Sequence, residues 1–196
     1  MERIKLNLAK FEKSGIDYIV NFLNRGKVIV YPTDTIYGIG CRADNKKAIS
    51  RIYKIKKREK KKPLLILVSS MAMAKKYCRI NKEQVLYLKK AWPGPVSVVC
   101  LSRQKLPVEL TGGLATQAVR LPKNNFLIRI VKKIGMPLVS TSLNLSGEPP
   151  ILELKNIEKI LNKEKPDLII DAGRLKNKAS KIIDIRDINK VKVLRK

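Results

Sequence analysis

Histidine is missing from all 196 residues of the chain. Its absence excludes a Ser-His-Asp triad, a Cys-His catalytic pair and zinc sites built on imidazole. Cysteine is scarce as well: Cys41, Cys78 and Cys100 are odd in number and widely spaced, with no metal-ligand or redox spacing, so we expect reduced, buried thiols. Any chemistry must therefore rely on hydroxyls, carboxylates, lysine, arginine and backbone groups, or come largely from a bound substrate.

Long apolar runs are also lacking. The longest, residues 64–68 and 96–101, fall far short of the ~20 residues that span a bilayer. Residues 1–15 carry charges throughout and contain no continuous apolar segment like that of a signal peptide. We therefore expect a cytoplasmic protein with no membrane partner.

Acidic residues are few: 16 Asp and Glu stand against 43 Lys and Arg, which gives a formal net charge of +27. Such an excess predicts attraction to polyanions, with nucleic acid as the first candidate. A compositional bias explains the charge equally well, because the lysines are scattered along the chain. Aromatic residues make up only 5% of the sequence, which leaves little for a platform on which bases stack.

Helical and strand patterns alternate along the chain. An apolar face at helical spacing, a capping Ser14 and a stop at Gly26 predict a helix over residues 14–26. We also expect helices over residues 45–56, 70–77, 81–91, 124–134 and 153–162. Short apolar or β-branched runs predict strands over residues 27–31, 64–68, 96–101, 117–122, 137–140, 167–170, 180–185 and 191–194. This alternation favours a layered α/β sheet, and no repeat or low-complexity linker divides the chain, so we expect one domain over residues 1–196.

The loop at 32–40 is the first candidate for a site. Pro32 cannot donate to a sheet, so it ends the preceding strand, and the polar residues 33–35 stand at a strand end where open α/β sheets bind ligands. The alternative is an ordinary loop with Tyr37 packed into the core.

Residues 56–62, KKREKKK, form the most basic run. Pro63 favours an extended link before the next strand, and from such a link Lys56, Arg58 and Lys62 can converge on a triphosphate. The alternative is a solvated basic run.

Two further segments place polar groups on or after short strands. Thr116 and Arg120 are four residues apart in a predicted strand, so they share a face, and an arginine there suits a carboxylate ligand or a structural ion pair with an acid. Residues 137–150, PLVSTSLNLSGEPP, carry four hydroxyls and one amide within seven positions, more than a turn requires.

The sequence resembles the YrdC-like L-threonylcarbamoyladenylate synthases in five segments that follow the family's order. They are YPTDTIYGIG (31–40), K-x-R at Lys56 and Arg58 followed by Lys62-Pro63, WPGPVSVV (92–99), TQAVRLP (116–122) and PLVSTSLNLSG (137–147), with weaker matches at SKIID (180–184) and Arg195. The resemblance covers roughly residues 15 to 195. It implies an open, twisted mixed α/β sheet with flanking helices, a positively charged concave face, and the family's short, single-domain form.

The resemblance also implies the reaction: L-threonine, bicarbonate or CO2, and ATP give threonylcarbamoyl-AMP and pyrophosphate. Other proteins then transfer the threonylcarbamoyl group to adenosine 37 of tRNAs that read codons beginning with A, forming t6A. Expected partners are therefore ATP, L-threonine, bicarbonate and the downstream transfer proteins, with tRNA reached through the basic surface.

The matching positions divide into two groups. The threonine group comprises Thr35, Arg120, Ser140 and Ser180, with Arg120 on the carboxylate. The ATP group comprises Lys56, Arg58, Lys62, Thr116, Ser142, Asn144 and Arg195, with Lys56 and Arg58 as the catalytic pair. We expect no all-protein metal site, and Mg2+ carried mainly on the ATP phosphates.

Three positions depart from the family pattern. Many members have proline where this chain has Glu59, and long members often have histidine at the position of Leu67 and serine near that of Pro150. Ile36, Tyr37 and Leu67 are candidate walls for the methyl group of threonine.

Two other functions compete with this interpretation. The first is a non-catalytic tRNA- or rRNA-binding or ribosome-maturation factor, which the net charge favours and the scarcity of aromatics disfavours. The second is a carbamoyl-transfer domain that uses carbamoyl phosphate, as in hydrogenase-maturation proteins, although the flanking domains and cysteine-rich fingers expected there are missing. Release of pyrophosphate that depends on both threonine and bicarbonate separates the three.

Overall fold

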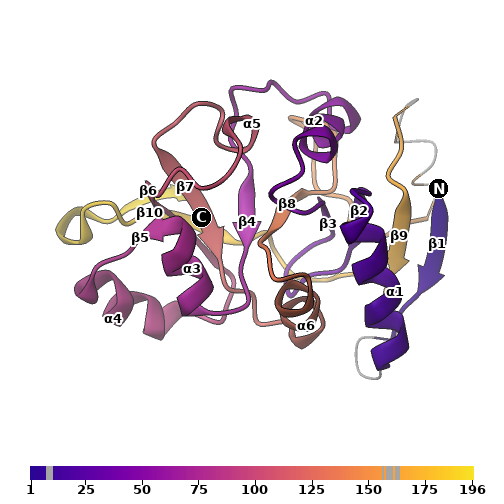
Figure 1. Cartoon of the computed structure of the whole chain (residues 1–196), viewed down its shortest axis with the longest axis horizontal. Coiled ribbons are helices and arrows are strands. Elements are labelled where there is room, and N and C mark those ends of the chain that lie inside the picture. The colour runs from indigo at the N-terminus through magenta and orange to yellow at the C-terminus, as the bar shows by residue number, and fades with distance from the viewer. Residues whose placement is uncertain (8–10, 156, 158–160, 162–163) are drawn as a thin grey trace.

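A single open sheet of mixed strand directions organises the molecule, which is a computed structural model describing residues 1–7, 11–155, 157, 161 and 164–196 (Figure 1). In the described part the sheet has eleven strands, ordered β1-β9-β2-β3-β8-β4-β7-β6-β10-β11, with β5 paired to β6. Their bounds are β1 (Glu2–Lys5), β2 (Ile29–Tyr31), β3 (Gly38–Gly40), β4 (Leu65–Leu67), β5 (Cys78–Arg79), β6 (Val96–Ser102), β7 (Thr116–Arg120), β8 (Leu138–Ser142), β9 (Leu168–Asp171), β10 (Lys181–Asp184) and β11 (Lys192–Arg195).

Strand β8 joins the two halves of this sheet. Its last residues pair antiparallel with β3, where Ser142 lies opposite Gly38. Its first residues pair antiparallel with β4, where Ser140 lies opposite Leu65. The two neighbouring strands therefore separate beside residues 140–142, near the end of β8.

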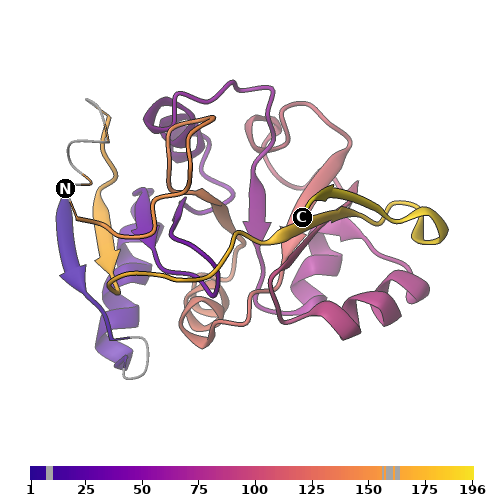
Figure 2. The same cartoon turned by 180° about the vertical axis from the view of Figure 1, so that it is seen from behind.

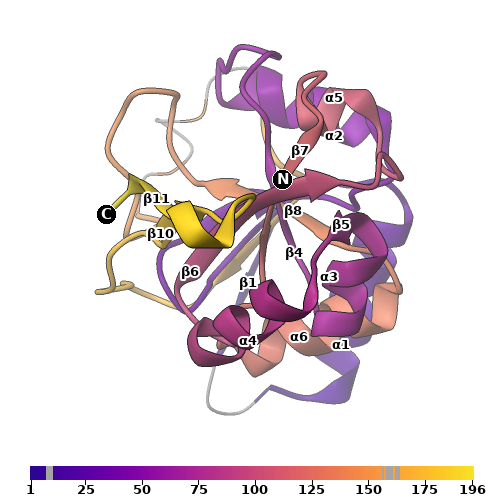
Figure 3. The same cartoon turned by 90° about the vertical axis from the view of Figure 1, so that its left-hand side faces the viewer.

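Helices cover the sheet on more than one side. Their bounds are α1 (Lys13–Asn24), α2 (Lys46–Ile55), α3 (Met71–Tyr77), α4 (Lys82–Ala91), α5 (Val108–Thr111) and α6 (Asn125–Ile134), with a 3-10 turn, η1, at Ile188–Lys190. In Figures 1 and 3, α2 and α5 lie above the strands, and α3, α4 and α6 lie below them. Short polar side chains begin four of these helices by accepting a backbone N–H of the first turn: Asn45, Ser70, Asn81 and Asn124.

Apolar side chains pack into two clusters. In one, α1 and α6 bury Leu23 and Phe126 against strand residues that include Tyr31, Leu67 and Leu138. The larger cluster contains alternate positions of the same strands, such as Val139 and Ile66, together with residues of α2, α3 and α4. The sheet is thus buried through both of its faces. All three cysteines are buried free thiols, as the sequence predicts.

Residues 172–180, here called the crossing segment, connect β9 to β10 across the middle of the sheet (Figure 2). The Tyr37 hydroxyl donates to the carbonyl of Gly173 at 2.6 Å and accepts the N–H of Ala172 at 2.9 Å. The Asn177 amide donates to the carbonyl of Asp34 at 2.9 Å. Two points of the loop between β2 and β3 therefore anchor the crossing segment.

The predicted α/β architecture is confirmed, with differences in the short elements. The loop predicted at 32–40 ends in β3, and the strand predicted at 137–140 extends to Ser142 because β3 pairs with its last two residues. Strands β1 and β5 and helix α5 were not predicted. The helix predicted at 153–162 falls largely on 156, 158–160 and 162, which lie outside the described residues. Within the described chain, every helix is too short or too polar to cross a bilayer.

Gly40 occupies a position where a side chain has no room. A Cβ atom there would lie 1.8 Å from the carbonyl oxygen of Val139 and 2.9 Å from the Tyr31 hydroxyl. We expect Gly40→Ala to lower the free energy of unfolding by about 1–3 kcal/mol, because β3 and β8 must move apart. Urea denaturation measures this change.

Gly15 provides the matched control, because it lies in α1 and a Cβ atom there would meet nothing within 4 Å. We expect Gly15→Ala to leave stability unchanged or to raise it by up to about 1 kcal/mol. Equal effects of the two substitutions would contradict the tight β3–β8 contact.

Candidate active site

A cleft of about 370 Å³ opens beside residues 140–142, where β3 and β4 separate. Side chains alternate across a strand, so the paired residues of neighbouring strands share a face. Three such pairs line the cleft: Gly38 with Ser142, Leu65 with Ser140, and Val99 with Ala118. The cleft floor is therefore one sheet face shared by β3, β8, β4, β7 and β6.

The same sheet face continues under helices α1 and α6. Leu67 and Leu138 lie two positions along from Leu65 and Ser140, and both pack in the α1–α6 cluster. Leu67 is thus a core residue rather than a cleft wall, which corrects one expectation. Ile36 and Tyr37, the other two expected wall residues, do line the cleft.

Arg120, the last residue of β7, is held at all three of its nitrogens. Its Nη2 donates to Asp34 Oδ1 at 2.6 Å, its Nη1 to Thr35 Oγ1 at 3.1 Å, and its Nε to the Gly94 carbonyl at 2.9 Å. Only 5% of the Arg120 side chain is exposed, and burial lowers its pKa. Of the two alternatives from the sequence, the structural ion pair is confirmed. Arg120 also lines the cleft, and its contact with a carboxylate ligand stays a prediction.

Arg58 and Lys62 reach the cleft from the non-helical link after α2. Arg58 Nε donates to the Lys62 carbonyl at 3.2 Å, and Nη2 donates to the Pro63 carbonyl at 3.0 Å. Burial lowers the pKa of Arg58. The Lys62 ammonium pairs with the Glu59 carboxylate at 2.6 Å, on an exposed part of the link.

Lys56, the C-cap of α2, points into the protein and is not among the lining residues. Its ammonium donates to the carbonyls of Ser142 and Asn144 and to the Asn144 side-chain oxygen, the latter two at 2.8 Å. Ser142 Oγ also donates to that oxygen at 2.7 Å. Lys56 thus fixes the main chain just after the hydroxyls of β8. Burial and the charge of Arg58 lower its pKa to about 7.

Arg195 approaches the cleft from the edge strand β11. Its Nη2 donates to the carbonyl and hydroxyl oxygens of Ser180 at 2.6 and 3.1 Å. The Ser180 hydroxyl lies 2.9 Å from that of Ser97, so three polar groups meet where β10 begins. Burial and the positive charge of Arg120 lower the pKa of Arg195.

Eight predicted site residues line this cleft together: Thr35, Arg58, Lys62, Arg120, Ser140, Ser142, Ser180 and Arg195. Lys56 and Asn144 contact the loop behind Ser142. Thr116 is on the same face of β7 as Arg120, but it pairs with Leu101 and is not among the residues that line the cleft.

The sequence-based choice of site residues omitted Asp34 and Ser97, which hold Arg120 and Ser180. Asp34 stands inside the loop singled out from the sequence, but nothing local shows that its partner is Arg120.

The cleft is strongly cationic. Among the described residues its lining includes Arg58, Lys62, Arg120 and Arg195 and no carboxylate. Charge-assisted hydrogen bonds from such groups suit phosphate and carboxylate ligands. The described chain has no group of three or more Cys, Asp or Glu side chains placed to hold a metal ion.

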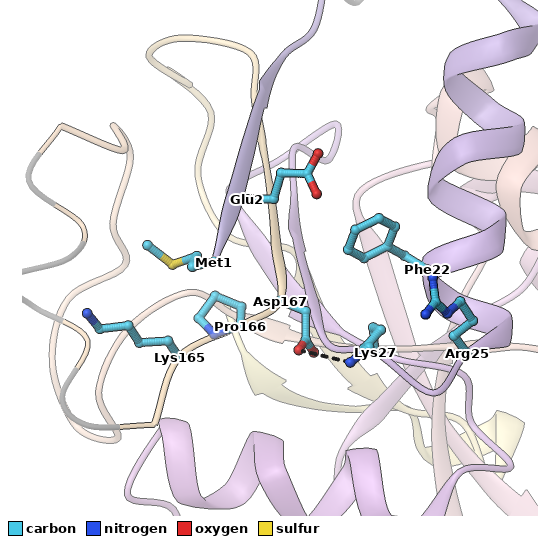
Figure 4. Close-up of a pocket in the computed structure, with 8 residues that line it drawn as sticks. All are labelled: Met1, Glu2, Phe22, Arg25, Lys27, Lys165, Pro166 and Asp167. Atoms are coloured by element: carbon cyan, nitrogen blue, oxygen red, sulfur yellow. Dashed lines mark ion pairs between the residues drawn. The ribbon is translucent and has the colours of Figure 1, made fainter.

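A second hollow, of about 440 Å³, lies at the opposite edge of the sheet, beside β1 (Figure 4). It is lined by Met1, Glu2, Phe22, Arg25, Lys27, Lys165, Pro166 and Asp167. The Asp167 carboxylate already accepts the Val28 N–H at 2.8 Å and pairs with Arg51 at 2.6 Å and Lys27 at 3.8 Å. These contacts give the acid a structural role, and none of the predicted site residues lies there.

Comparisons with known proteins point the same way. The sequence model of the Sua5_yciO_yrdC family, described as "Telomere recombination", matches residues 21–196. A threonylcarbamoyl-AMP synthase of Blochmanniella floridana is 36% identical over 177 residues, which are 89% of this chain and 92% of that protein. Pyrococcus abyssi Sua5 complexed with L-threonine superimposes with a TM-score of 0.82 at 29% identity, over 93% of this chain and 53% of that one. Escherichia coli YciO superimposes with a TM-score of 0.87 at 26% identity, over 100% of this chain and 94% of that one.

The lowered pKa of Lys56 makes a prediction about stability. A folded-state pKa of about 7, below the ordinary 10.5, means that the unfolded chain binds more protons across this interval. The contribution of Lys56 to the free energy of unfolding therefore rises as pH increases from about 7 to about 10. We expect the wild type to gain stability relative to Lys56→Met over this range.

Urea denaturation of both proteins at pH 7 and pH 9.5 measures the difference. A difference that stays constant with pH would show that Lys56 keeps its ordinary pKa. Lys82, which is exposed in the first turn of α4, offers the control, and Lys82→Met should show no such dependence.

Proposed function

The chain belongs to the Sua5/YciO/YrdC family, and we propose that it is an enzyme that makes threonylcarbamoyl-AMP and pyrophosphate from L-threonine, bicarbonate or CO2, and ATP. The product serves the t6A37 modification of tRNAs that read codons beginning with A, through downstream transfer proteins in the cytoplasm. One observation carries the proposal: four cationic side chains and several serine and threonine hydroxyls line one cleft that no described carboxylate lines.

Threonine occupies the part of the cleft around Arg120. The bonds of this guanidinium to Asp34, Thr35 and Gly94 use three of its five N–H groups, so one on each terminal nitrogen remains for a carboxylate. Thr35, Ser140 and Ser180 surround this end with hydroxyls, and Ile36 provides apolar contact. A hydroxyl-rich site favours threonine over valine, because valine would leave buried polar groups unpaired.

ATP occupies the part of the cleft around Arg58 and Arg195. Lys62 and Ser142 supply further donors, so the triphosphate meets positive groups from three distant segments of the chain. Lys56 and Asn144 act from behind by fixing the main chain that carries Ser142. Thr116 begins β7 on the nucleotide side.

The reaction needs no protein nucleophile. The amine of threonine attacks CO2, or bicarbonate with loss of water, to give a carbamate. A carbamate oxygen then attacks the α-phosphate in line, the bond to the bridging oxygen breaks, and pyrophosphate leaves. Catalysis of this kind consists mainly of positioning and charge neutralisation, which Arg58, Lys62 and Arg195 provide. Mg2+ bound to the ATP phosphates would offset further charge on the leaving pyrophosphate.

The alternative function is binding of tRNA or rRNA without catalysis. The net charge of +27 supports affinity for an RNA backbone, and the same basic surface can deliver product toward tRNA-bound partners. A cleft with convergent cations on one sheet face favours a small anionic ligand over an extended polymer.

Pyrophosphate release from ATP tests the proposal directly. We expect release that requires both threonine and bicarbonate, with serine and valine as poorer substrates. Arg120→Lys should raise the KM for threonine about tenfold or more with little change in the KM for ATP, because a lysine cannot reproduce the two-nitrogen contact with a carboxylate.

Arg42→Lys is the matched control, since Arg42 pairs with Asp44 at 2.7 Å outside the cleft, and it should leave both KM values unchanged. RNA binding without threonine- and bicarbonate-dependent turnover would replace the enzymatic function with the alternative.

Glu59 generates a prediction specific to this chain. Its carboxylate oxygen Oε1 forms an ion pair with Lys62 Nζ at 2.6 Å, so it competes with phosphate oxygens for the same ammonium. Because the pair is exposed, we expect Glu59→Gln to lower the KM for ATP by only about two- to fivefold. Glu83→Gln, an exposed change of equal charge on α4, should have no effect. An unchanged KM for ATP in Glu59→Gln would show that Lys62 does not contact the nucleotide.

A further inference from the structure

Asp34 makes two specific contacts, and the proposed reaction gives its carboxylate no role. Its Oδ1 accepts Arg120 Nη2 at 2.6 Å, and its Oδ2 accepts the backbone N–H of Lys123 at 3.0 Å. Its side chain is 13% exposed and is not among the residues that line the cleft. The carboxylate therefore lies behind Arg120, away from any ligand.

The two other guanidiniums of the cleft are oriented differently. Arg58 is held by the carbonyls of Lys62 and Pro63, and Arg195 by the carbonyl and hydroxyl of Ser180. These groups fix a guanidinium without cancelling its charge. Among the three guanidiniums of the described lining, Arg120 alone has a carboxylate partner, whereas the exposed ammonium of Lys62 pairs with Glu59.

A carboxylate behind Arg120 weakens the attraction of that guanidinium for an anion. Because the Arg120 guanidinium is buried, the Asp34 carboxylate offsets part of the cost of burying that charge. The bond also has a geometric consequence. Thr35 and Gly94 hold two nitrogens, and the Asp34 bond fixes the third, so the guanidinium plane cannot turn.

A fixed plane matters for recognition of a carboxylate. Two parallel N–H···O bonds form only when the guanidinium and the carboxylate lie nearly in one plane. The bond from Asp34 uses one N–H of Nη2 and leaves the other for a ligand. A fixed orientation therefore benefits an anion that both terminal nitrogens of Arg120 contact.

We propose that Asp34 is a positioning residue, which orients Arg120 for the carboxylate of the amino-acid substrate through the Nη2–Oδ1 bond. The inference rests on the proposed function, because it takes that carboxylate to be threonine's. Asp34 touches neither substrate and acts only through Arg120. Its main-chain carbonyl, which accepts from Asn177, also holds the crossing segment against the same loop.

Asp34→Asn tests the proposal with almost no change in shape. The amide can still accept the Lys123 N–H but no longer offers a charged acceptor to Arg120. We expect the KM for threonine to rise about tenfold, with the KM for ATP unchanged within about twofold. Asp44→Asn is the matched control, since it removes the same charge from an Asp–Arg pair outside the cleft and should change neither value.

A double-mutant cycle separates positioning from stability. If Asp34 acts through Arg120, adding Asp34→Asn to Arg120→Lys should change the KM for threonine by less than about twofold. Thermal unfolding of each variant reports any loss of the fold. Independent, multiplicative effects of the two substitutions would overturn the proposal, as would equal rises in both KM values for Asp34→Asn.

The wild type distinguishes failure of this inference from failure of the proposed function. No threonine-dependent pyrophosphate release by the wild type overturns the enzymatic function and, with it, the role of Asp34. Normal turnover by the wild type, together with an unchanged KM for threonine in Asp34→Asn, overturns only the role of Asp34.

Discussion

The pairing of β8 with two different neighbours is the constraint on which the site depends. Its backbone bonds to β4 and to β3 along different parts of one short strand. Both neighbours must approach closely, and for β3 this requires Gly40 against the Val139 carbonyl. Because strand side chains alternate, this register turns Ser140 and Ser142 to the cleft and Val139 into the core. A shift by one residue would exchange them.

The cleft keeps part of its positive charge because two of its four cations, Arg58 and Arg195, have no carboxylate partner among the described residues. Lys56, Arg58 and Arg195 all donate to main-chain carbonyls, which supply partial negative charge and fixed geometry. Carboxylate partners would satisfy the same donors but would cancel the potential that a polyphosphate needs. Burial lowers the pKa values of these groups, because removal from water disfavours their charged forms.

Local patterns predicted most of the helices and longer strands, because apolar periodicity can be recognised from adjacent residues. They did not predict β1 or β5. Each is short and exists through a distant partner, as Glu2 does opposite Leu168. In and around β3 the core residues Tyr37, Ile39 and Cys41 alternate with glycines, which do not favour a strand by themselves, and the pairing with β2 and β8 makes this segment a strand.

The same limit applies to the site. Residue types and family order indicated the groups that meet in the cleft, including Arg58, Arg120 and Ser142. They could not indicate that Lys56 turns inward, or that Asp34 rather than another acid pairs with Arg120. Such partner choices follow from tertiary register, which places residues 34 and 120 side by side although 86 positions separate them.

Strand β11 forms the outer rim of the sheet and, in the described chain, has a partner on one side only. Rim strands open at a smaller free-energy cost than interior ones, through fraying that leaves the remaining fold intact. Arg195 lies on this strand and donates to the Ser180 carbonyl, so opening of β11 would also break the bond that holds this guanidinium beside the start of β10.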